Sequence, residues 1–204
     1  MEFELLGSDA VGPTLELDHE QFAYAGKFGT GRTGTTLLRT DGDASTTDEP
    51  GSESKITDAE PDGSGPRILA AACFNRNHAA PETARIRYVT VRRDRRGEGL
   101  GTVLLAVTGR ELSRRHDRVA IAVNNPVAYR ACYKAGFAFT GEETGMSELR
   151  LVYEGDRSVE RYEAGLDQFR ERDLPADQRA VLDSEFPERR VPDAAIDSLH
   201  PDGG

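Results

Sequence analysis

The order of local signals between residues 84 and 137 constrains the fold more than any other feature of the sequence. The segment ARIRYVTVR, residues 84–92, has the alternation of a strand, and RVAIAVN, residues 118–124, is typical of a buried strand. Between them, apolar residues recur at helical spacing from 101 to 112. NPVAYRACYKAGF, residues 125–137, predicts a second helix that Asn125 caps and Gly136 closes. Two strands joined by one helix predict a parallel pair with a right-handed crossover.

The turn that joins the first strand to its helix is rich in glycine and arginine. In RRGEGLG, residues 95–101, three glycines allow backbone N–H groups to converge, and the helix directs the positive end of its dipole to the same place. A Walker P-loop would need a lysine after Gly101, and a dinucleotide-binding fold would need glycine at Thr102 and an acidic residue at Asn124. The turn therefore predicts a pyrophosphate site, with a tight turn of solvated arginines as the alternative.

This turn and the second helix resemble two sequence blocks of the GNAT acyltransferase superfamily. The first block, which holds the pyrophosphate of CoA, matches at Arg96, Gly99 and Gly101, with Val91 leading into the turn. The second block matches at Asn125, Ala128, Gly136 and Phe137, and the resemblance extends from Ile68 to Tyr153. It implies an α/β fold of the GNAT type, with a mixed central sheet, splayed parallel strands and flanking helices. It also implies acetyl-CoA as a cosubstrate, without a metal.

The resemblance further implies which residues hold acetyl-CoA. Val89 and Val91 would meet the pantetheine arm along the strand edge, and Asn125 would contact the same arm. The backbone amides expected to hold the pyrophosphate are those of Arg96, Gly97, Glu98, Gly99, Leu100, Gly101 and Thr102. A backbone N–H in the cleft between the splayed strands would stabilise the oxyanion when an amine attacks the acetyl carbonyl.

The second block of the family commonly carries a tyrosine that protonates the departing CoA thiolate, and here the register departs from that pattern. Counting from Asn125 places Cys132 at this position, with Tyr133 one residue later. A phenol with a pKa of about 10 suits the role better than a thiol, so we expect Tyr133 to be the acid and keep Cys132 as the alternative. The general base stays open among Glu142, Glu143, His78 and water.

Charge and composition restrict the partners. Lysine occurs only at three positions, arginine supplies the other basic residues, and 36 acidic residues leave a net charge of −10, which resembles salt-loving archaeal proteins. The arginines cluster mainly in one short turn, which argues against nucleic acid as a partner. No apolar run approaches the ~20 residues of a membrane span, and the first residues are acidic, so we expect a cytoplasmic protein. Cys73 and Cys132 lack metal-ligand spacing, which predicts reduced thiols without a metal.

Composition also predicts the domain organisation. Residues 1–153 form the expected acyltransferase domain, in which 33–40 and 67–75 are strands and the acidic segment 41–66 is a mobile hairpin loop. The segment 17–28 favours a short helix over a strand. Residues 154–204 form a C-terminal helical extension, in which Val159, Tyr162, Leu166 and Phe169 share one face; packing on the domain, a homodimer contact and a lid all fit that face. After Leu182 we expect a frayed tail.

The sequence thus predicts an N-acetyltransferase that moves an acetyl group directly from acetyl-CoA to a primary amine. A small amine, an amino acid, an antibiotic and a protein N-terminus all stay open as acceptors. The alternative is a GNAT-like module that binds acyl-CoA without catalysis, as a sensor or a scaffold.

Overall fold

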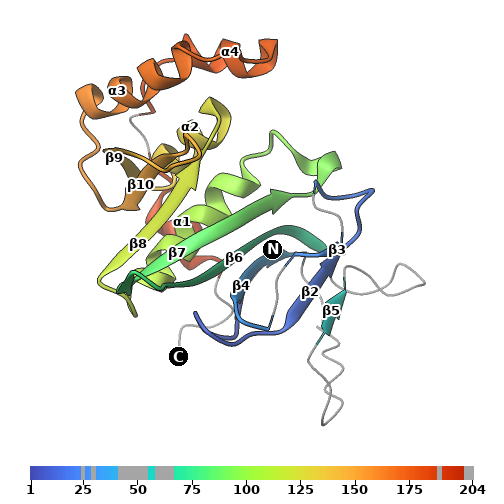
Figure 1. Cartoon of the computed structure of the whole chain (residues 1–204). Coiled ribbons are helices and arrows are strands. Elements are labelled where there is room, and N and C mark those ends of the chain that lie inside the picture. The colour runs from blue at the N-terminus through green and yellow to red at the C-terminus, as the bar shows by residue number, and fades with distance from the viewer. Residues whose placement is uncertain (24–25, 29–30, 41–54, 58–66, 188–189, 200–204) are drawn as a thin grey trace.

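The computed structural model describes residues 1–23, 26–28, 31–40, 55–57, 67–187 and 190–199, and its centre is a mixed sheet (Figure 1). Seven strands follow one another in the order β1-β4-β6-β7-β8-β10-β9. Their bounds are β1 (Glu2–Leu6), β4 (Gly34–Arg39), β6 (Ile68–Asn77), β7 (Ala80–Val91), β8 (Arg118–Val123), β9 (Phe137–Glu143) and β10 (Leu149–Tyr153). Neighbouring strands pair antiparallel, except that β7 and β8 are parallel. The predicted α/β fold with a mixed sheet is confirmed.

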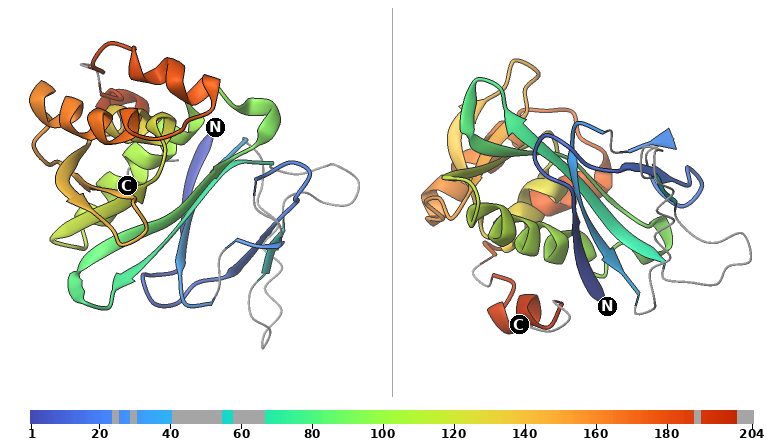
Figure 2. Two further views of the ribbon diagram at one scale, coloured as in Figure 1. Left: turned by 45° about the horizontal axis from the view of Figure 1, so that its top comes forward. Right: turned by 90° about the horizontal axis from the view of Figure 1, so that it is seen from below.

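Helix α1 (Leu100–Ser113) makes the crossover between β7 and β8 and covers one face of the sheet (Figure 2). Its buried side chains join a core that also takes in Ile86 of β7 and Ile121 of β8. The hydroxyl groups of Thr36 on β4 and Thr108 on α1 share a buried hydrogen bond of 2.8 Å. This bond gives each buried hydroxyl group a hydrogen-bond partner, so neither carries the free-energy cost of an unpaired buried polar group. The bond also fixes the helix against the sheet.

The opposite face of the sheet is covered by a second, three-stranded sheet in the order β3-β2-β5. Its strands are β2 (Thr14–Leu17), β3 (Gly26–Lys27) and β5 (Lys55–Thr57). A smaller core lies between the two sheets and consists of Leu15, Leu17, Phe22, Phe28, Leu37, Ile68, Ala71 and Cys73. The chain therefore has three layers, with α1 on one side of the main sheet and the small sheet on the other.

The described residues of the segment 17–28, which are 17–23 and 26–28, do not form the helix that we expected. Strand β2 ends at Leu17, and Asp18 then closes a turn, in which its carboxylate accepts hydrogen bonds from the Glu20 N–H and the Gln21 side-chain amide, both at 2.8 Å. Such an aspartate turn competes with helix propagation. Strands β4 and β6 form the predicted hairpin, but Lys55–Thr57 inside the predicted loop is strand β5, and the rest of 41–66 lies outside the described residues.

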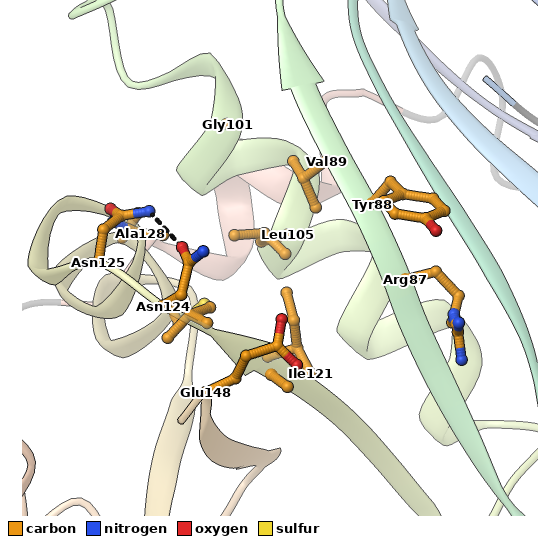
Figure 3. Close-up of a pocket in the computed structure, with 14 residues that line it drawn as sticks. Arg87, Tyr88, Val89, Gly101, Leu105, Ile121, Asn124, Asn125, Ala128 and Glu148 are labelled. Atoms are coloured by element: carbon orange, nitrogen blue, oxygen red, sulfur yellow. Dashed lines mark hydrogen bonds between the residues drawn. The ribbon is translucent and has the colours of Figure 1, made fainter. Parts of the chain in front are cut away.

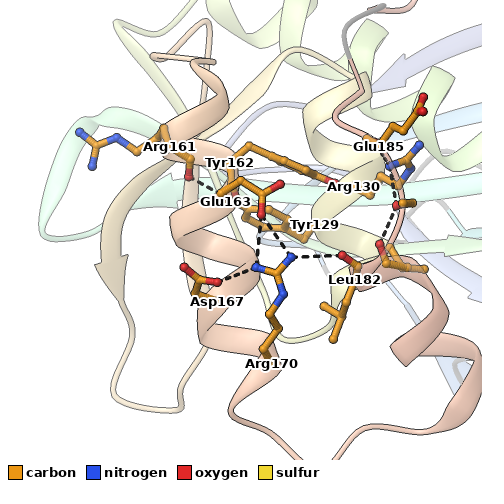
Figure 4. A network of polar contacts seen from close by, with 11 residues as sticks. Tyr129, Arg130, Arg161, Tyr162, Glu163, Asp167, Arg170, Leu182 and Glu185 are labelled. Carbon is orange, nitrogen blue, oxygen red and sulfur yellow. Dashed lines mark hydrogen bonds and ion pairs between the residues drawn. The ribbon is translucent and has the colours of Figure 1, made fainter.

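The C-terminal part contains helices α3 (Val159–Arg170), α4 (Ala176–Leu182) and α5 (Asp193–Asp197), of which α3 and α4 lie beside helix α2 (Pro126–Lys134) (Figures 1 and 2). Tyr162, Leu166 and Phe169 of α3 are buried in the main core, whereas Val159, expected on the same face, is 49% exposed. Arg170 links the two helices, because its guanidinium contacts the carboxylates of α3 and the Leu182 carbonyl of α4 (Figure 4). Of the three uses predicted for the apolar face, packing on the domain is the one observed.

The described residues of the tail after Leu182, 183–187 and 190–199, are packed, which corrects the expectation that they fray. Ile196 and Leu199 are buried in the main core, and the Phe3 N–H of β1 donates to the Leu199 carbonyl at 2.9 Å. The tail thus reaches across to the edge strand at the beginning of the chain. In the described part of the chain, no helix combines the length and the apolar character needed to cross a bilayer.

Candidate active site

The parallel strands β7 and β8 separate part-way along their length. They pair only from Thr83 opposite Arg118 to Ile86 opposite Ile121, and β7 then continues to Val91 without β8 beside it. At the same point the pairing of β7 with β6 changes register, because Ile86 lies opposite Phe74 and Tyr88 opposite Cys73, so that Arg87 is left over as a bulge. A bulge bends its strand and increases the local twist. The predicted splay is therefore present, and it begins at Arg87. Figure 1 shows strands β7 and β8 diverging from each other.

The separation leaves a cavity of about 310 Å³ between the two strands (Figure 3). Strand β7 contributes one wall, strand β8 the other, and helices α1 and α2 line it as well. The lining residues are Arg87, Tyr88, Val89, Gly101, Leu105, Ile121, Ala122, Val123, Asn124, Asn125, Ala128, Ala131, Cys132 and Glu148. We call this cavity the cleft.

The edge of β7 that faces the cleft carries free hydrogen-bonding capacity. The Arg92 N–H donates to Leu69 of β6 at 3.0 Å, so this residue faces β6. Backbone groups alternate in direction along a strand, and those of Val89 and Val91 are therefore directed away from β6, toward the cleft. Both residues lie beyond the last pair between β7 and β8. An extended chain with amide groups can pair with such an edge as an added strand would.

The glycine-rich turn lies next to the cleft and has the backbone of an anion site. Gly97 and Gly99 have φ values of 85° and 84°, and a Cβ atom on either would meet nothing within 4 Å. Helix α1 starts at Leu100 without a side-chain cap, and its first helical hydrogen bond runs from Val103 N–H to the Gly99 carbonyl at 3.0 Å. The backbone N–H groups of the residues just before Val103 thus have no acceptor within the helix. They are directed outward from its N-terminal end.

The residues around this turn differ in their contacts and exposure. Arg95 and Glu98 form a two-bond ion pair, with contacts of 2.8 and 2.7 Å, while Arg96 is exposed. Gly101 lines the cleft, and a Cβ atom there would lie 3.1 Å from the Val91 side chain. A larger residue at 101 would therefore narrow the passage from the turn to the cleft.

Asn125 stands at the start of α2 as predicted. Its Oδ1 accepts the Ala128 N–H at 2.8 Å, and its Nδ2 donates to Oδ1 of Asn124 at 3.2 Å (Figure 3). Both asparagines line the cleft. The capping role therefore holds the Asn125 side chain in place beside the cavity.

The structure brings Cys132 to the cleft and does not bring Tyr133 there. Cys132 lies on the face of α2 that lines the cavity, and burial raises the pKa of its thiol to about 12. Tyr133 lies on the other face of α2, fully buried, where its hydroxyl accepts the Phe139 N–H at 3.0 Å and its ring packs against Tyr162 and Phe186. Burial raises the pKa of this phenol as well. The expectation that Tyr133 protonates a thiolate in the cleft does not fit this placement.

The structure also shows which candidates for the general base lie at the cleft and which lie elsewhere. Glu142 pairs with Arg150 at 3.3 Å and Glu143 with Arg172 at 3.2 Å, and neither lines the cleft; His78 lines a different cavity. Glu148 was not among the expected site residues, but it lines the cleft. It precedes β10, and its carboxyl group is directed into the space between β7 and β8 (Figure 3). Thr144 holds it, because its hydroxyl donates to the Glu148 carboxylate at 3.3 Å. No signal in one sequence distinguishes Glu148 from the other carboxylates of the chain.

Comparison with known proteins identifies the family. The model of the family described as "Acetyltransferase (GNAT) family" matches residues 33–137, which is half of the chain and includes β7, the glycine-rich turn, α1, β8 and α2. The chain belongs to the GNAT acetyltransferase family. The match ends where β9 begins, so Glu148 and the C-terminal helices of this GNAT protein lie outside the matched part. No curated protein matches the chain.

Several solved structures resemble this GNAT protein. A protein assigned to the GNAT family from Desulfovibrio desulfuricans is 15% identical over 59% of this chain and 67% of its own, with a TM-score of 0.39. The PaiA N-acetyltransferase from Thermoplasma acidophilum in complex with coenzyme A is 15% identical over 43% and 54%, with a TM-score of 0.35. An acetyltransferase from Thermus thermophilus is 20% identical over 42% and 56%, with a TM-score of 0.35. Likenesses this weak carry no argument about substrates.

Proposed function

We propose that the protein is an N-acetyltransferase that transfers an acetyl group directly from acetyl-CoA to a primary amine. The observation that carries the proposal is the position of the glycine-rich turn at the end of the strand that opens the cleft. One extended ligand with an anionic end could thus occupy the turn and the strand edge together.

The turn and the strand edge would divide the binding of acetyl-CoA between them. The amides from Arg96 to Thr102 and the positive end of the α1 dipole would hold the pyrophosphate, with the left-handed glycines keeping Cβ atoms out of its way. Val89 and Val91 would pair with the two amides of the pantetheine arm, and Asn125 would border the same arm. This arrangement directs the thioester toward Ile86 and Ile121, where the strands meet.

Within the cleft, Glu148 is the group that we assign as general base. The neutral amine attacks the acetyl carbon, a C–N bond forms, and a cleft-facing N–H of β7 stabilises the oxyanion. The nitrogen loses its proton to Glu148, directly or through a water molecule, and the C–S bond breaks. Amide product and CoA thiolate result.

The thiolate then takes a proton from solvent in this proposal. A CoA thiol has a reference pKa of about 8.5, so its thiolate is a weak base that needs little help at neutral pH. Cys132 is a poor donor because burial raises its pKa to about 12, which makes proton transfer from it to a thiolate uphill. Its place among Ala128 and Ala131 fits a small apolar wall residue.

The test is acetyl transfer itself. Purified protein is mixed with acetyl-CoA and a broad panel of primary amines, free thiol is followed with a colorimetric reagent, and acetyl-CoA binding is measured separately by calorimetry. Binding together with amine-dependent thiol release supports the proposal. Binding without release from any amine favours the non-catalytic acyl-CoA sensor, and the absence of binding contradicts both.

A further inference from the structure

A second cavity, of about 680 Å³, is lined by residues of both layers on the side of the main sheet that the small sheet covers. Its walls come from β6, from β7 and from the segments before β2 and before β4. Arg87 and Tyr88 of the β7 bulge line both this cavity and the cleft. The two cavities therefore share one wall at the place where β7 and β8 part. We call the second cavity the acceptor chamber.

The side chains that line the acceptor chamber include more positive than negative charges. Asp9 and Arg76 pair within it, with Nε and Oδ2 2.6 Å apart, and so offset each other. Arg32 and Arg87 also line the chamber, and neither forms an ion pair with any carboxylate of the described residues. Both arginines are exposed. Two guanidinium groups at one cavity with no carboxylate partner among the described residues stand out in a chain with a net charge of −10.

The chamber also presents an aromatic wall. Phe28 and Tyr88 lie close to each other in it, with ring centroids 6.3 Å apart and planes inclined at 60°. These rings would suit a ligand with an apolar portion.

We propose that the acceptor chamber binds the acetyl acceptor and that this acceptor is a primary amine carrying a carboxylate, such as an amino acid. This inference rests on the proposed acetyl transfer. Arg32 and Arg87 hold the carboxylate, since a guanidinium group presents paired N–H donors that match its two oxygens. Phe28 and Tyr88 contact the apolar part.

The shared wall explains how such an acceptor meets the acetyl group. With its carboxylate at Arg87, the amine reaches past the bulge to the end of the paired segment of β7 and β8. Glu148 faces the same point from the cleft side. The acceptor and acetyl-CoA thus approach from opposite sides of β7, and the carboxylate sets which nitrogen is presented.

Matched amines test the inference. Acetyl transfer is measured with the twenty common L-amino acids and with their C-terminal amides, which keep the amine and the side chain and remove one charge. Phosphoethanolamine tests a phosphate in place of the carboxylate. The variants are Arg87→Gln and Arg32→Gln, with Arg115→Gln as control, because Arg115 is exposed and lines neither cavity. We expect kcat/KM at least tenfold higher for the best amino acid than for its amide, with this ratio near one in either chamber variant and unchanged in the control.

A binding measurement separates this inference from the proposed function. N-acetyl-L-phenylalanine and its amide are titrated into the protein without CoA, and acetyl-CoA is titrated in parallel. Selective binding of the carboxylate, at least tenfold weaker in Arg87→Gln, supports the chamber even if acetyl-CoA fails to bind and the proposed function falls. Equal or better transfer to the amides, or a preference for phosphoethanolamine, overturns the inference, whereas the proposed function stands because acetyl transfer to an amine is still observed. The absence of both amino acid transfer and carboxylate binding also overturns the inference, and the proposed function then stands if another primary amine releases thiol from acetyl-CoA.

Discussion

Ile86 of β7 lies opposite Ile121 of β8 in the last pair that joins these two parallel strands. Both residues are buried in the main core, and the next residue of β7, Arg87, is the bulge. The closed end of the cleft is therefore anchored by packed apolar residues, while the open end is bent away from β8. A rigid base with a splayed mouth is suited to holding a thioester at a fixed point.

Replacement of Gly99 by valine is expected to weaken the binding of acetyl-CoA at least tenfold, which is about 1.4 kcal/mol. Its φ of 84° suits glycine, and a Cβ there would point into the open space where the pyrophosphate is proposed to lie. Calorimetric titration measures the loss. Gly141→Val is the matched control, since Gly141 has a φ of 90° far from the turn, beside the movable Arg161 guanidinium. Equal affinity in Gly99→Val and wild type, with both proteins folded, would falsify the pyrophosphate site.

Replacement of Glu148 by glutamine is expected to lower kcat by roughly 10²-fold, because general base catalysis contributes about that much or more. Affinity for acetyl-CoA should change little, since glutamine keeps the size and the contact with Thr144. Glu142→Gln and Glu143→Gln serve as controls, because these carboxylates pair with surface arginines outside the cleft. If a control lowers kcat as much as Glu148→Gln does, Glu148 is not the base.

Replacement of Tyr133 by phenylalanine is expected to lower stability and to leave kcat within a few-fold of wild type. The hydroxyl accepts the buried Phe139 N–H, and a buried N–H without an acceptor costs about 1–3 kcal/mol. Urea unfolding and steady-state kinetics measure the two effects. A kcat lowered by 10²-fold with unchanged stability would instead return the role of proton donor to Tyr133.

The two buried thiols are expected to make the protein less stable as the pH rises from 8 to 10. Burial raises the pKa of Cys132 from 9.0 to about 12 and that of Cys73 from 9.0 to about 11. The unfolded thiols lose their protons through pH 9 while the folded thiols keep them, so the free energy of unfolding falls as the pH rises. The loss is about 1.4 kcal/mol for each thiol over this interval.

Urea unfolding at pH 8 and pH 10 measures this loss, and a protein that carries both Cys73→Ala and Cys132→Ala is the control. The double variant is expected to be less stable than wild type at both pH values because packing is lost. Its free energy of unfolding should fall by about 3 kcal/mol less than that of wild type between pH 8 and pH 10. An identical change in both proteins would show that the thiols do not carry the pH dependence.

Local signals predicted much of the site. The cap at Asn125, the glycines of the turn and the crossover helix depend on residues close together in sequence, and all are present in the structure. The faces of α2 could not be assigned in this way. Which of Cys132 and Tyr133 faces the cleft depends on where the aromatic residues Tyr162 and Phe186 pack, some 30 to 50 residues later in the chain.

Other features were not predictable from local sequence for similar reasons. The bulge at Arg87 arises from the register between β6 and β7, and Glu148 reaches the cleft only because β10 pairs with β8. The turn at Asp18 depends on its own side chain, so the helical pattern of 17–28 was misleading. The tail looked polar, yet Ile196 and Leu199, two of its apolar residues, are buried in the core.

The most direct test of acetyl-CoA binding in the cleft is the change of backbone amide signals in NMR spectra as acetyl-CoA is added. We predict the largest shifts at Val89, Val91 and residues 97–102, with slower hydrogen exchange of the Val89 and Val91 amides once the pantetheine pairs with them. Shifts confined to other parts of the protein, or unchanged exchange at both valines under saturating acetyl-CoA, would contradict the account.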